Sequence, residues 1–474
     1  MIFLEGETPF YQKLRGVIAM KQVVFYITVV SMFVFAGCSM NQGKPLDSKP
    51  PKNVIVMVGD GMGIGQIEIA RLLEKGKEGR LFLQTLPNVG LVQTYSFDNF
   101  VPDSAAAGTS LATGIKTINK RVGMTPEGQK VDSIADLFKN DGKSVGLIST
   151  NTVVDATPAS FGASVTTRSE QAEIARQLLA NGFDVILGGG AKYFGEKKQK
   201  GPDLIPQFKE KGYVVVKDKN ELAAAGNPEK LLGLFTSSYM NYVQDLEEKN
   251  SLEPSILEMT KAAIGSLSKN KKGFFLMSEG ARIDHAAHAV DVTSVWRETV
   301  EFDKAVEFAV NWAKKDGNTL VVVVADHETM GLSAAEPMDI EALKAIEVSA
   351  EFIAYQFVKN ADKSAFTIDS IQSAFKKYAN IDISAEEAAE LNERSKNNKG
   401  GLAYEYKIGW EIGSIIAEHY GVGAMSTGIR ARSKTGGHSG NMIPIFVYGP
   451  GATVFNGVMD NTDVFKKIKM VAKY

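Results

Sequence analysis

The chain contains a single cysteine, Cys38, so it cannot form an internal disulfide bond and must be held together by other contacts. It also lacks an excess of charge: 53 Lys and Arg residues balance 55 Asp and Glu residues, which gives a formal net charge of -2. A nucleic-acid partner is therefore not expected, because such a partner usually requires a clear basic excess. Residues 53–474 contain no apolar run long enough to span a bilayer.

The N-terminal segment has the pattern of an export signal. A basic start after Met20 is followed by an apolar stretch over residues 23–35 and by small residues next to Cys38. This ending is typical of a bacterial lipoprotein signal, in which the cysteine is lipidated. An ordinary cleaved signal is the alternative, and a membrane anchor is disfavoured because the apolar run is too short. We predict a signal over residues 1–38, with Met20 as an alternative start, and a polar tether over 39–52. The predicted location is the periplasm, or the outer membrane of a bacterium as an anchored lipoprotein.

Six short apolar runs predict buried strands, because their hydrophobicity is continuous rather than alternating. They cover residues 53–59, 144–149, 184–188, 273–277, 319–325 and 443–448. Helical patterns lie between them, over residues 64–73, 104–113, 133–140, 169–181, 254–268 and 293–315. This alternation predicts an α/β fold, a three-layer sandwich with a large, mostly parallel central sheet flanked by helices. Residues 333–425 hold helical segments and no good strand, so we predict an inserted helical cap within a single catalytic domain over 53–474.

Acidic residues follow three of these apolar runs: Asp60, Glu279 and Asp326. Ligands of open α/β sheets bind outside the carboxyl ends of the strands, so the three acids are expected to converge in one crevice. A single acid at such a place is more often a helix cap or a turn residue. Several acids together with histidines indicate a metal site instead.

The chain has only five histidines, and four lie in segments that suit a metal site. Asp284 and His288 are four residues apart, which places both on one face of a helix, and His285 lies between them. His327 follows a predicted strand, and His438 lies in a Gly-rich loop that permits close approach to a site. Carboxylates and imidazoles without thiolates suit Zn²⁺ and related divalent ions.

Ser104 follows Pro-Asp and precedes a run of small, helix-compatible residues. It is expected at a helix N-terminus, where free N–H groups and the helix dipole favour an anion. Alone, such a serine is more often a simple N-cap residue, and the metal-type residues elsewhere in the chain favour the reactive role. The fifth histidine, His419, lies near the end of a helical pattern and is expected to be a surface or helix-terminal residue.

A series of segments resembles, in order, the successive motifs of alkaline phosphatases. They are GDGMG (59–63), VPDSAAAGT (101–109), DATPASF (155–161) with VTTR (165–168), DVILGGGAKYF (184–194), EGARIDHAAH (279–288), ADHET (325–329) and GGHSGNMIPIFVYGPGA (436–452). Each motif is a modest signal alone, but the ordered set spans nearly the whole chain after the tether. The resemblance implies a metal-dependent enzyme that hydrolyses small-molecule phosphate monoesters, with a homodimer as the expected assembly.

The resemblance also implies a role for each matching residue, with two zinc ions and one magnesium ion per subunit. The matching metal ligands are Asp284, His288 and His438 for the first zinc, Asp60, Asp326, His327 and Ser104 for the second, and Asp60, Thr157 and Glu279 for magnesium, with Asp155 holding waters around it. Ser104 is then the nucleophile that forms a phosphoserine, and Arg168 binds the phosphoryl oxygens. Asp155 with His285 is a mixed pair for this family, so His285 either contacts phosphate through water or ligates a metal.

Two other functions stay open on the sequence alone. A phosphodiesterase or a sulfatase-like hydrolase would use the same fold, but diesterases commonly have a Thr nucleophile and lack counterparts of Arg168, Thr157 and Glu279. A lipid-anchored binding protein that has lost catalysis is less favoured, because the expected ligands and Ser104 are all present.

Overall fold

A computed structural model describes residues 49–397 and 401–474 of the 474-residue chain. The predicted signal (1–38) with Cys38 and most of the predicted tether (39–52) lie outside the described residues. Residues 50–474 form one unit. Among the helices of the described ranges, none combines the length and the apolar character needed to cross a membrane.

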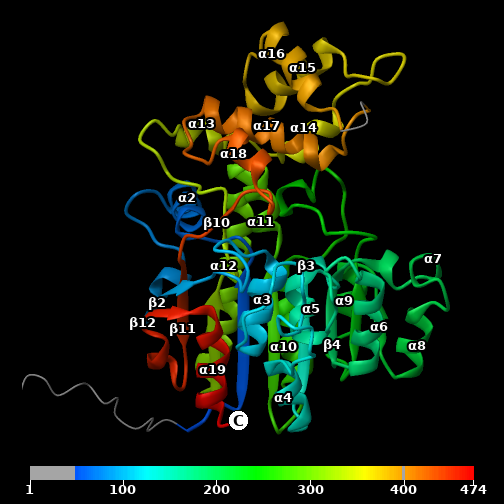
Figure 1. The fold of residues 1–474 in the computed structure, drawn as a ribbon, viewed down its shortest axis with the longest axis vertical. Coiled ribbons are helices and arrows are strands. Elements are labelled where there is room, and N and C mark those ends of the chain that lie inside the picture. Colours follow the sequence, from blue (N-terminus) through cyan, green and yellow to red (C-terminus); the bar gives the residue numbers. More distant parts are fainter. Residues whose placement is uncertain (1–48, 398–400) are drawn as a thin grey trace, which may run out of the picture. The chain divides into compact units, whose positions relative to one another are not determined.

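A ten-stranded sheet forms the centre of this unit (Figure 1). Its strands are, in spatial order, β12 (Gly457–Asp460), β2 (Asn88–Gln93), β11 (Ile443–Tyr448), β8 (Thr319–Val324), β1 (Asn53–Gly59), β7 (Phe274–Gly280), β3 (Ser144–Thr152), β4 (Val185–Gly189), β6 (Leu231–Leu234) and β5 (Val214–Val216). Within this sheet β11 runs antiparallel to both neighbours, and the other pairs are parallel. The central strands β1, β7 and β8 are buried along their whole length, which explains their continuous apolar sequences. The predicted mostly parallel α/β sheet is confirmed.

Helices flank this sheet in two groups, as the three-layer prediction requires (Figure 1). One group packs around the longest helix and consists of α2 (Ile64–Lys75), α10 (Ile256–Leu267) and α12 (Val292–Asp316). The other group consists of α3 (Ser104–Thr113), α4 (Ile134–Asn140), α5 (Ala156–Gly162) and α19 (Asn461–Ala472). Helix α6 (Gln171–Asn181) precedes β4. The short helices α7 (Glu196–Gln199), α8 (Leu204–Glu210) and α9 (Lys219–Ala224) lie between β4 and β7.

A second apolar cluster lies among the helices that follow β9 (Glu328–Thr329). These helices are α13 (Ile340–Lys344), α14 (Ala350–Tyr355), α15 (Ile368–Ala379), α16 (Ala385–Arg394), α17 (Glu405–His419) and α18 (Thr427–Arg432). Their buried side chains, Ile353 and Ile412 among them, belong to the same cluster as Ala286 and Ala287 of α11 (Arg282–His288). The chain then reaches β10 (His438–Ser439), which pairs antiparallel with β9. The second apolar cluster therefore joins helices α13–α17 to the helix that carries His288.

The N-terminus of α3 determines the position of Ser104 in the helix. Asp103 is the N-cap residue, and its side chain accepts a hydrogen bond from the backbone N–H of Ala106 at 3.1 Å. Ser104 is thus the first helical residue, and the simple N-cap interpretation of Ser104 is wrong. All residues of α3 are buried, and their small size allows close packing on α5: a Cβ added at Gly108 would lie 2.9 Å from Ser160 Oγ.

Candidate active site

The carboxyl ends of β8, β1 and β7 bring together the three acids predicted there, with Glu279 inside the end of β7 and the other two just after their strands. The strands are adjacent in the sheet, so Asp60, Glu279 and Asp326 meet at one edge. Burial raises the pKa of Asp60 well above its usual range, and the nearby carboxylates of Asp326, Asp284 and Glu279 raise it further. Burial likewise raises the pKa of Glu279 to about 8 and that of Asp326 to about 6. The expected convergence is therefore observed, in a place where a cation would favour the ionised carboxylates.

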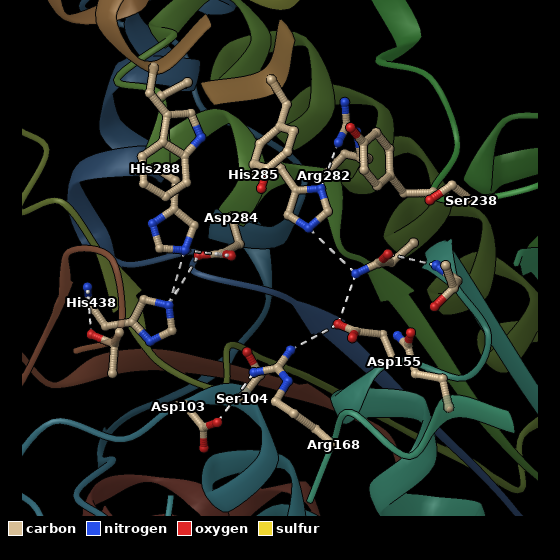
Figure 2. A pocket seen from close by; sticks show the side chains of 18 of the residues that line it. Asp103, Ser104, Asp155, Arg168, Ser238, Arg282, Asp284, His285, His288 and His438 are labelled. Carbon is tan, nitrogen blue, oxygen red and sulfur yellow. Dashed lines mark hydrogen bonds and ion pairs between the residues drawn. The ribbon is translucent and has the colours of Figure 1, made fainter. Parts of the chain in front are cut away.

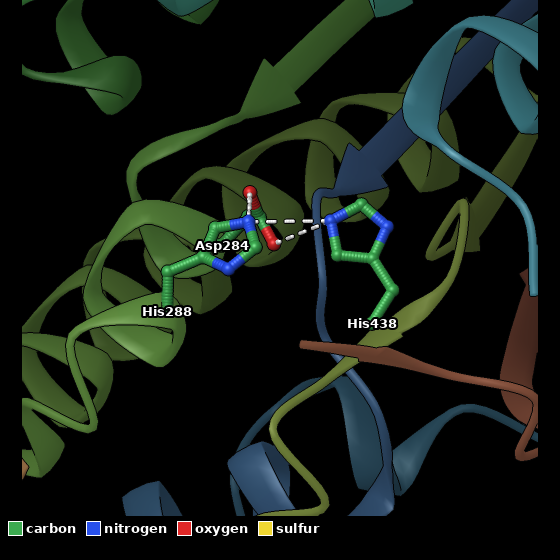
Figure 3. A group of neighbouring side chains, drawn as sticks. All are labelled: Asp284, His288 and His438. Carbon is green, nitrogen blue, oxygen red and sulfur yellow. Dashed lines mark hydrogen bonds and ion pairs between the residues drawn. The ribbon is translucent and has the colours of Figure 1, made fainter. Parts of the chain in front are cut away.

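Asp284, His288 and His438 form a buried group whose candidate ligand atoms lie within 4.8 Å of one another (Figure 3). His288 Nε2 lies 3.2 Å from Asp284 Oδ2 and 3.2 Å from His438 Nε2. The Nδ1 atoms of His288 and His438 lie 2.8 Å and 3.0 Å from the carbonyl oxygens of Gly436 and Pro102. Because a carbonyl oxygen only accepts, each Nδ1 carries the proton and each Nε2 keeps a free lone pair, as in metal-binding histidines.

Asp60, Asp284 and His327 form a second buried group of the same kind, so Asp284 is shared by both groups. Asp326, which the sequence analysis places with Asp60 and His327, lies beside this group: its Oδ2 is 3.1 Å from His327 Nε2. Asp326 Oδ1 accepts hydrogen bonds from the backbone N–H groups of Gly61 (3.2 Å) and His327 (2.9 Å). One oxygen of Asp326 is thus fixed by the backbone, and the other faces the imidazole.

Unpartnered oxygen atoms indicate that cations fit this site. Among the described residues, Asp60 Oδ1, Glu279 Oε1 and Thr157 Oγ1 are buried without a hydrogen-bond partner. Asp326 Oδ2 also has no hydrogen bond, although it lies 3.1 Å from His327 Nε2. Such atoms are rare in folded proteins, because an unpaired buried carboxylate oxygen is costly. After burial itself, Asp155 is among the groups that raise the pKa of Glu279, so it lies near this oxygen set. Carboxylate and imidazole ligands suit zinc, and an oxygen-only set suits magnesium.

Ser104 and Arg168 lie next to these groups (Figure 2). Ser104 Oγ is 3.1 Å from His327 Nε2. The Arg168 guanidinium contacts two carboxylates, Asp103 at 3.4 Å and Asp155 at 3.0 Å. Burial acts to lower the pKa of Arg168, but Asp155 and Asp103 outweigh it and the net pKa is raised. Arg168 therefore stays charged, and its side chain keeps 27% of its surface exposed, which lets it bind an anion.

One cavity of about 680 Å³ contains Ser104, Arg168, His285, His288 and His438 in its lining (Figure 2). Its wall also includes residues for which the sequence predicts no role: Asn151, Tyr239, Arg282, Tyr406 and Trp410. Only Arg282 lies inside a recognised motif, EGARIDHAAH, which is the one signal that could have drawn attention to it. The others come from separate segments, and no motif marks them.

His285 lines this cavity but belongs to neither of the two cation-type groups found among the described residues. Its Nδ1 lies 2.6 Å from Arg282 Nη1, and its Nε2 lies 3.5 Å from Asn151 Nδ2. Burial lowers the pKa of His285 to about 3, and Arg282 is the next cause. His419 is the exposed last residue of α17, as expected.

A cavity with groups suited to cations on one side and a serine and an arginine on the other suits the hydrolysis of phosphate esters. The fold and the site therefore define a metal-dependent phosphoric ester hydrolase. Residues 51–474 match the family model described as "Alkaline phosphatase". The chain belongs to the alkaline phosphatase family, as its ordered motifs predict, and it is an enzyme that hydrolyses phosphate monoesters.

Some known relatives resemble this chain over nearly all of its length. It is 32% identical to "Alkaline phosphatase 4" of Bacillus subtilis, over 94% of this chain and 95% of the relative. The crystal structure of Thermus thermophilus alkaline phosphatase matches with a TM-score of 0.79 and 27% identity, over 92% of this chain and 96% of that chain. A mutant alkaline phosphatase of the Antarctic bacterium TAB5, solved with Mg bound in its M3 site, matches with a TM-score of 0.64 and 28% identity, over 90% and 99% of the two chains.

Proposed function

We propose that Ser104 is the nucleophile of this phosphatase and carries the phosphoryl group as a phosphoserine. The observation that carries this proposal is the position of Ser104 as first residue of α3, with Oγ 3.1 Å from His327 Nε2 in the cavity lined by Arg168. Because Asp103 caps the helix, the Ser104 hydroxyl is not required for capping.

The reaction then has two steps. Ser104 Oγ attacks phosphorus, the bond between phosphorus and the alcohol oxygen breaks, and the alcohol leaves with the proton given up by the Ser104 hydroxyl. The oxygen of a water molecule then attacks the phosphoserine, the bond between phosphorus and Oγ breaks, and one proton of the water restores the serine hydroxyl as inorganic phosphate leaves. In both steps Arg168 donates N–H groups to oxygens of the phosphoryl group, and the N-terminal N–H groups of α3 favour the same negative charge.

We assign the cation ligands as the motifs imply, with two Zn²⁺ and one Mg²⁺ per subunit. The proposed sets are Asp284, His288 and His438; Asp60, Asp326, His327 and Ser104; and Asp60, Thr157 and Glu279 with Asp155 nearby. When bound, divalent ions neutralise developing negative charge and lower the pKa of a hydroxyl group or water that they contact. The nitrogen ligands of the first two sets support zinc, and the oxygen-only third set supports magnesium. The Mg-bound TAB5 structure supports a magnesium site in the family.

His285 is proposed to contact the bound phosphate. Support comes from its place in the cavity wall and from its absence from both cation-type groups of the described residues.

Export, lipidation of Cys38 and a homodimer complete the proposal. The signal-like segment before Cys38 supports the first two, and the likeness to the family supports the third. Mass spectrometry of the mature N-terminus and partitioning between detergent and water test the lipid. Mature protein that begins elsewhere and stays in water excludes it. Sedimentation analysis tests the dimer.

Ser104→Ala tests the nucleophile. We expect turnover of an aryl phosphate to fall by about 10³-fold or more while elemental analysis still finds the metals bound. Acid-quenched wild-type protein should carry one added phosphoryl group, located on Ser104 by peptide mapping, and the variant should not. Unchanged turnover in Ser104→Ala contradicts the phosphoserine.

Chelation tests the cations and the substrate class together. We expect activity to disappear with the metals and to return only when Zn²⁺ and Mg²⁺ are both restored. Metal-loaded wild-type protein that hydrolyses a diester or a sulfate ester but no monoester would contradict the assigned chemistry.

A further inference from the structure

Arg282 is a buried arginine whose guanidinium is held from several directions. The residue is 2% exposed, and its guanidinium lies over the ring of Tyr242 at 3.6 Å and that of Tyr239 at 4.5 Å from the ring centroids. Nη2 donates to Glu351 Oε2 of α14 at 3.2 Å. Nη1 lies 2.6 Å from His285 Nδ1. Because two rings and an ion pair restrain the guanidinium, the direction of Nη1 toward His285 is fixed.

The contact with Arg282 determines which nitrogen of His285 carries the proton. An arginine N–H group only donates, so Nδ1 must accept, and the hydrogen of the neutral ring is on Nε2. That Nε2 lies 3.5 Å from Asn151 Nδ2. The orientation of Asn151 is also fixed, because its Oδ1 accepts from Thr152 N at 2.7 Å and its Nδ2 donates to Asp155 Oδ2 at 2.9 Å. Two donors that meet in this way cannot bond to each other, whereas one anionic oxygen can accept from both.

This donor pair lies next to the proposed phosphate site. His285 lines the same cavity as Ser104 and Arg168 (Figure 2). Asn151 belongs to the lining of this cavity as well. Asp155 Oδ2 joins the two parts, since it accepts from Asn151 Nδ2 at 2.9 Å and from Arg168 Nη2 at 3.0 Å. An anion that binds to Arg168 is therefore adjacent to the two donors.

We propose that Arg282 is a positioning residue that fixes His285 as an Nε2–H donor, and that His285 and Asn151 together bind an oxygen of the phosphate anion. The inference rests on the proposed function, in which Arg168 binds the phosphoryl group. It also makes α14 part of the site, because Glu351 holds the arginine. Substrate and product affinity then depend on the helical region as well as on the sheet.

Binding of inorganic phosphate to the metal-loaded protein, measured by titration calorimetry, tests this role independently of turnover. We expect Arg282→Gln to raise the Kd about tenfold, the effect of one hydrogen bond to an anion. In a His285→Ala background the same substitution should change the Kd by about twofold or less, because the group through which it acts is gone. Arg297→Gln is the matched control: Arg297 lies over the Trp296 ring at 4.7 Å and donates to the Ile346 carbonyl at 2.9 Å, outside this cavity.

If Arg282→Gln weakens phosphate binding equally in the wild-type and His285→Ala backgrounds, Arg282 acts through its charge or through general stability, and the proposal is overturned. An unchanged Kd in Arg282→Gln, with only a fall in Tm like that of Arg297→Gln, overturns it as well. Should Arg282→Gln fail to fold, Asn151→Ala carries the test: a Kd raised about fivefold supports the donor pair, and an unchanged Kd overturns it. Wild-type protein that binds phosphate in this pattern but hydrolyses no monoester contradicts the proposed function and leaves the positioning role intact.

Discussion

Asp103 supports two parts of the site with separate oxygens. Its Oδ1 accepts the backbone N–H groups of Ala106 (3.1 Å) and Lys120 (3.0 Å), and its Oδ2 lies 3.4 Å from Arg168 Nη1. Asp103→Asn keeps an acceptor for both N–H groups, whereas Asp103→Ala removes it. Loss of an N-cap costs about 1 kcal/mol, and an unpaired N–H group costs about 1 kcal/mol more. We expect Asp103→Ala to lower the free energy of unfolding by about 2 kcal/mol, and Asp103→Asn by about 0.5 kcal/mol or less.

Both variants lose the charge beside Arg168, so they should share one Kd for inorganic phosphate. Urea unfolding at a fixed metal concentration measures the stability, and calorimetry measures the Kd. The pair Asp339→Asn and Asp339→Ala gives the cost of an N-cap alone, because Asp339 caps α13 through Ala342 N at 3.0 Å and does not line the cavity. Equal destabilisation by Asp103→Asn and Asp103→Ala would refute the reasoning, since the two Oδ1 bonds would then contribute nothing.

Two further predictions concern stability away from the reacting groups. Glu298 of α12 is buried and accepts from Val243 N at 2.7 Å, and burial raises its pKa to about 7. This folded-state pKa lies above the unfolded value of about 4.3. The stability of wild-type protein relative to Glu298→Gln is therefore largest below about pH 4 and falls as the pH rises through about 7, by at most about 4 kcal/mol. Parallel Tm curves for the two proteins from about pH 5 to 8 would contradict this. In α17, a Cβ added at Gly413 would lie 2.2 Å from the Ala289 carbonyl oxygen, so Gly413→Ala should destabilise by about 2 kcal/mol. Gly428→Ala in α18 should not destabilise the protein in this way, because a Cβ added there would lie 3.8 Å from its nearest neighbour, Arg432 Nη1. Equal Tm values for the two alanine variants would exclude the tight contact at Gly413.

The central strands could be predicted from the sequence because both faces of each are buried. β1 and β11 have the predicted bounds, and β8 ends one residue earlier. The sequence does not predict β2, β5, β6 and β12, because each is short or partly exposed and so lacks a long continuous apolar run. β7 extends through Ser278 and Glu279 to Gly280, beyond the predicted end at 277, because these polar residues are buried at the site.

Site residues that belong to a local sequence pattern could also be predicted. The acids at strand ends and the spacing of Asp284 and His288 follow from the order of the chain. The sharing of Asp284 between two groups does not, since it depends on how α11 lies against the turn at Gly61 that follows β1. The same is true of Asn151 and Glu351, whose contacts join segments far apart in the sequence.

The short ladder of β9 and β10 pairs His438 with Thr329 and Ser439 with Glu328. The chain therefore leaves the site after Thr329 and returns to it at His438, which pairs with Thr329. Helices α13–α18 all lie between these two positions in the sequence. In evolutionary terms, such a closed junction lets the outer helices α15 and α16 change in length or sequence without altering the spacing of His327 and His438. Divergence in these two helices can then leave the cavity wall unchanged, whereas changes in α14 and α17 cannot, because Glu351, Tyr406 and Trp410 line the cavity.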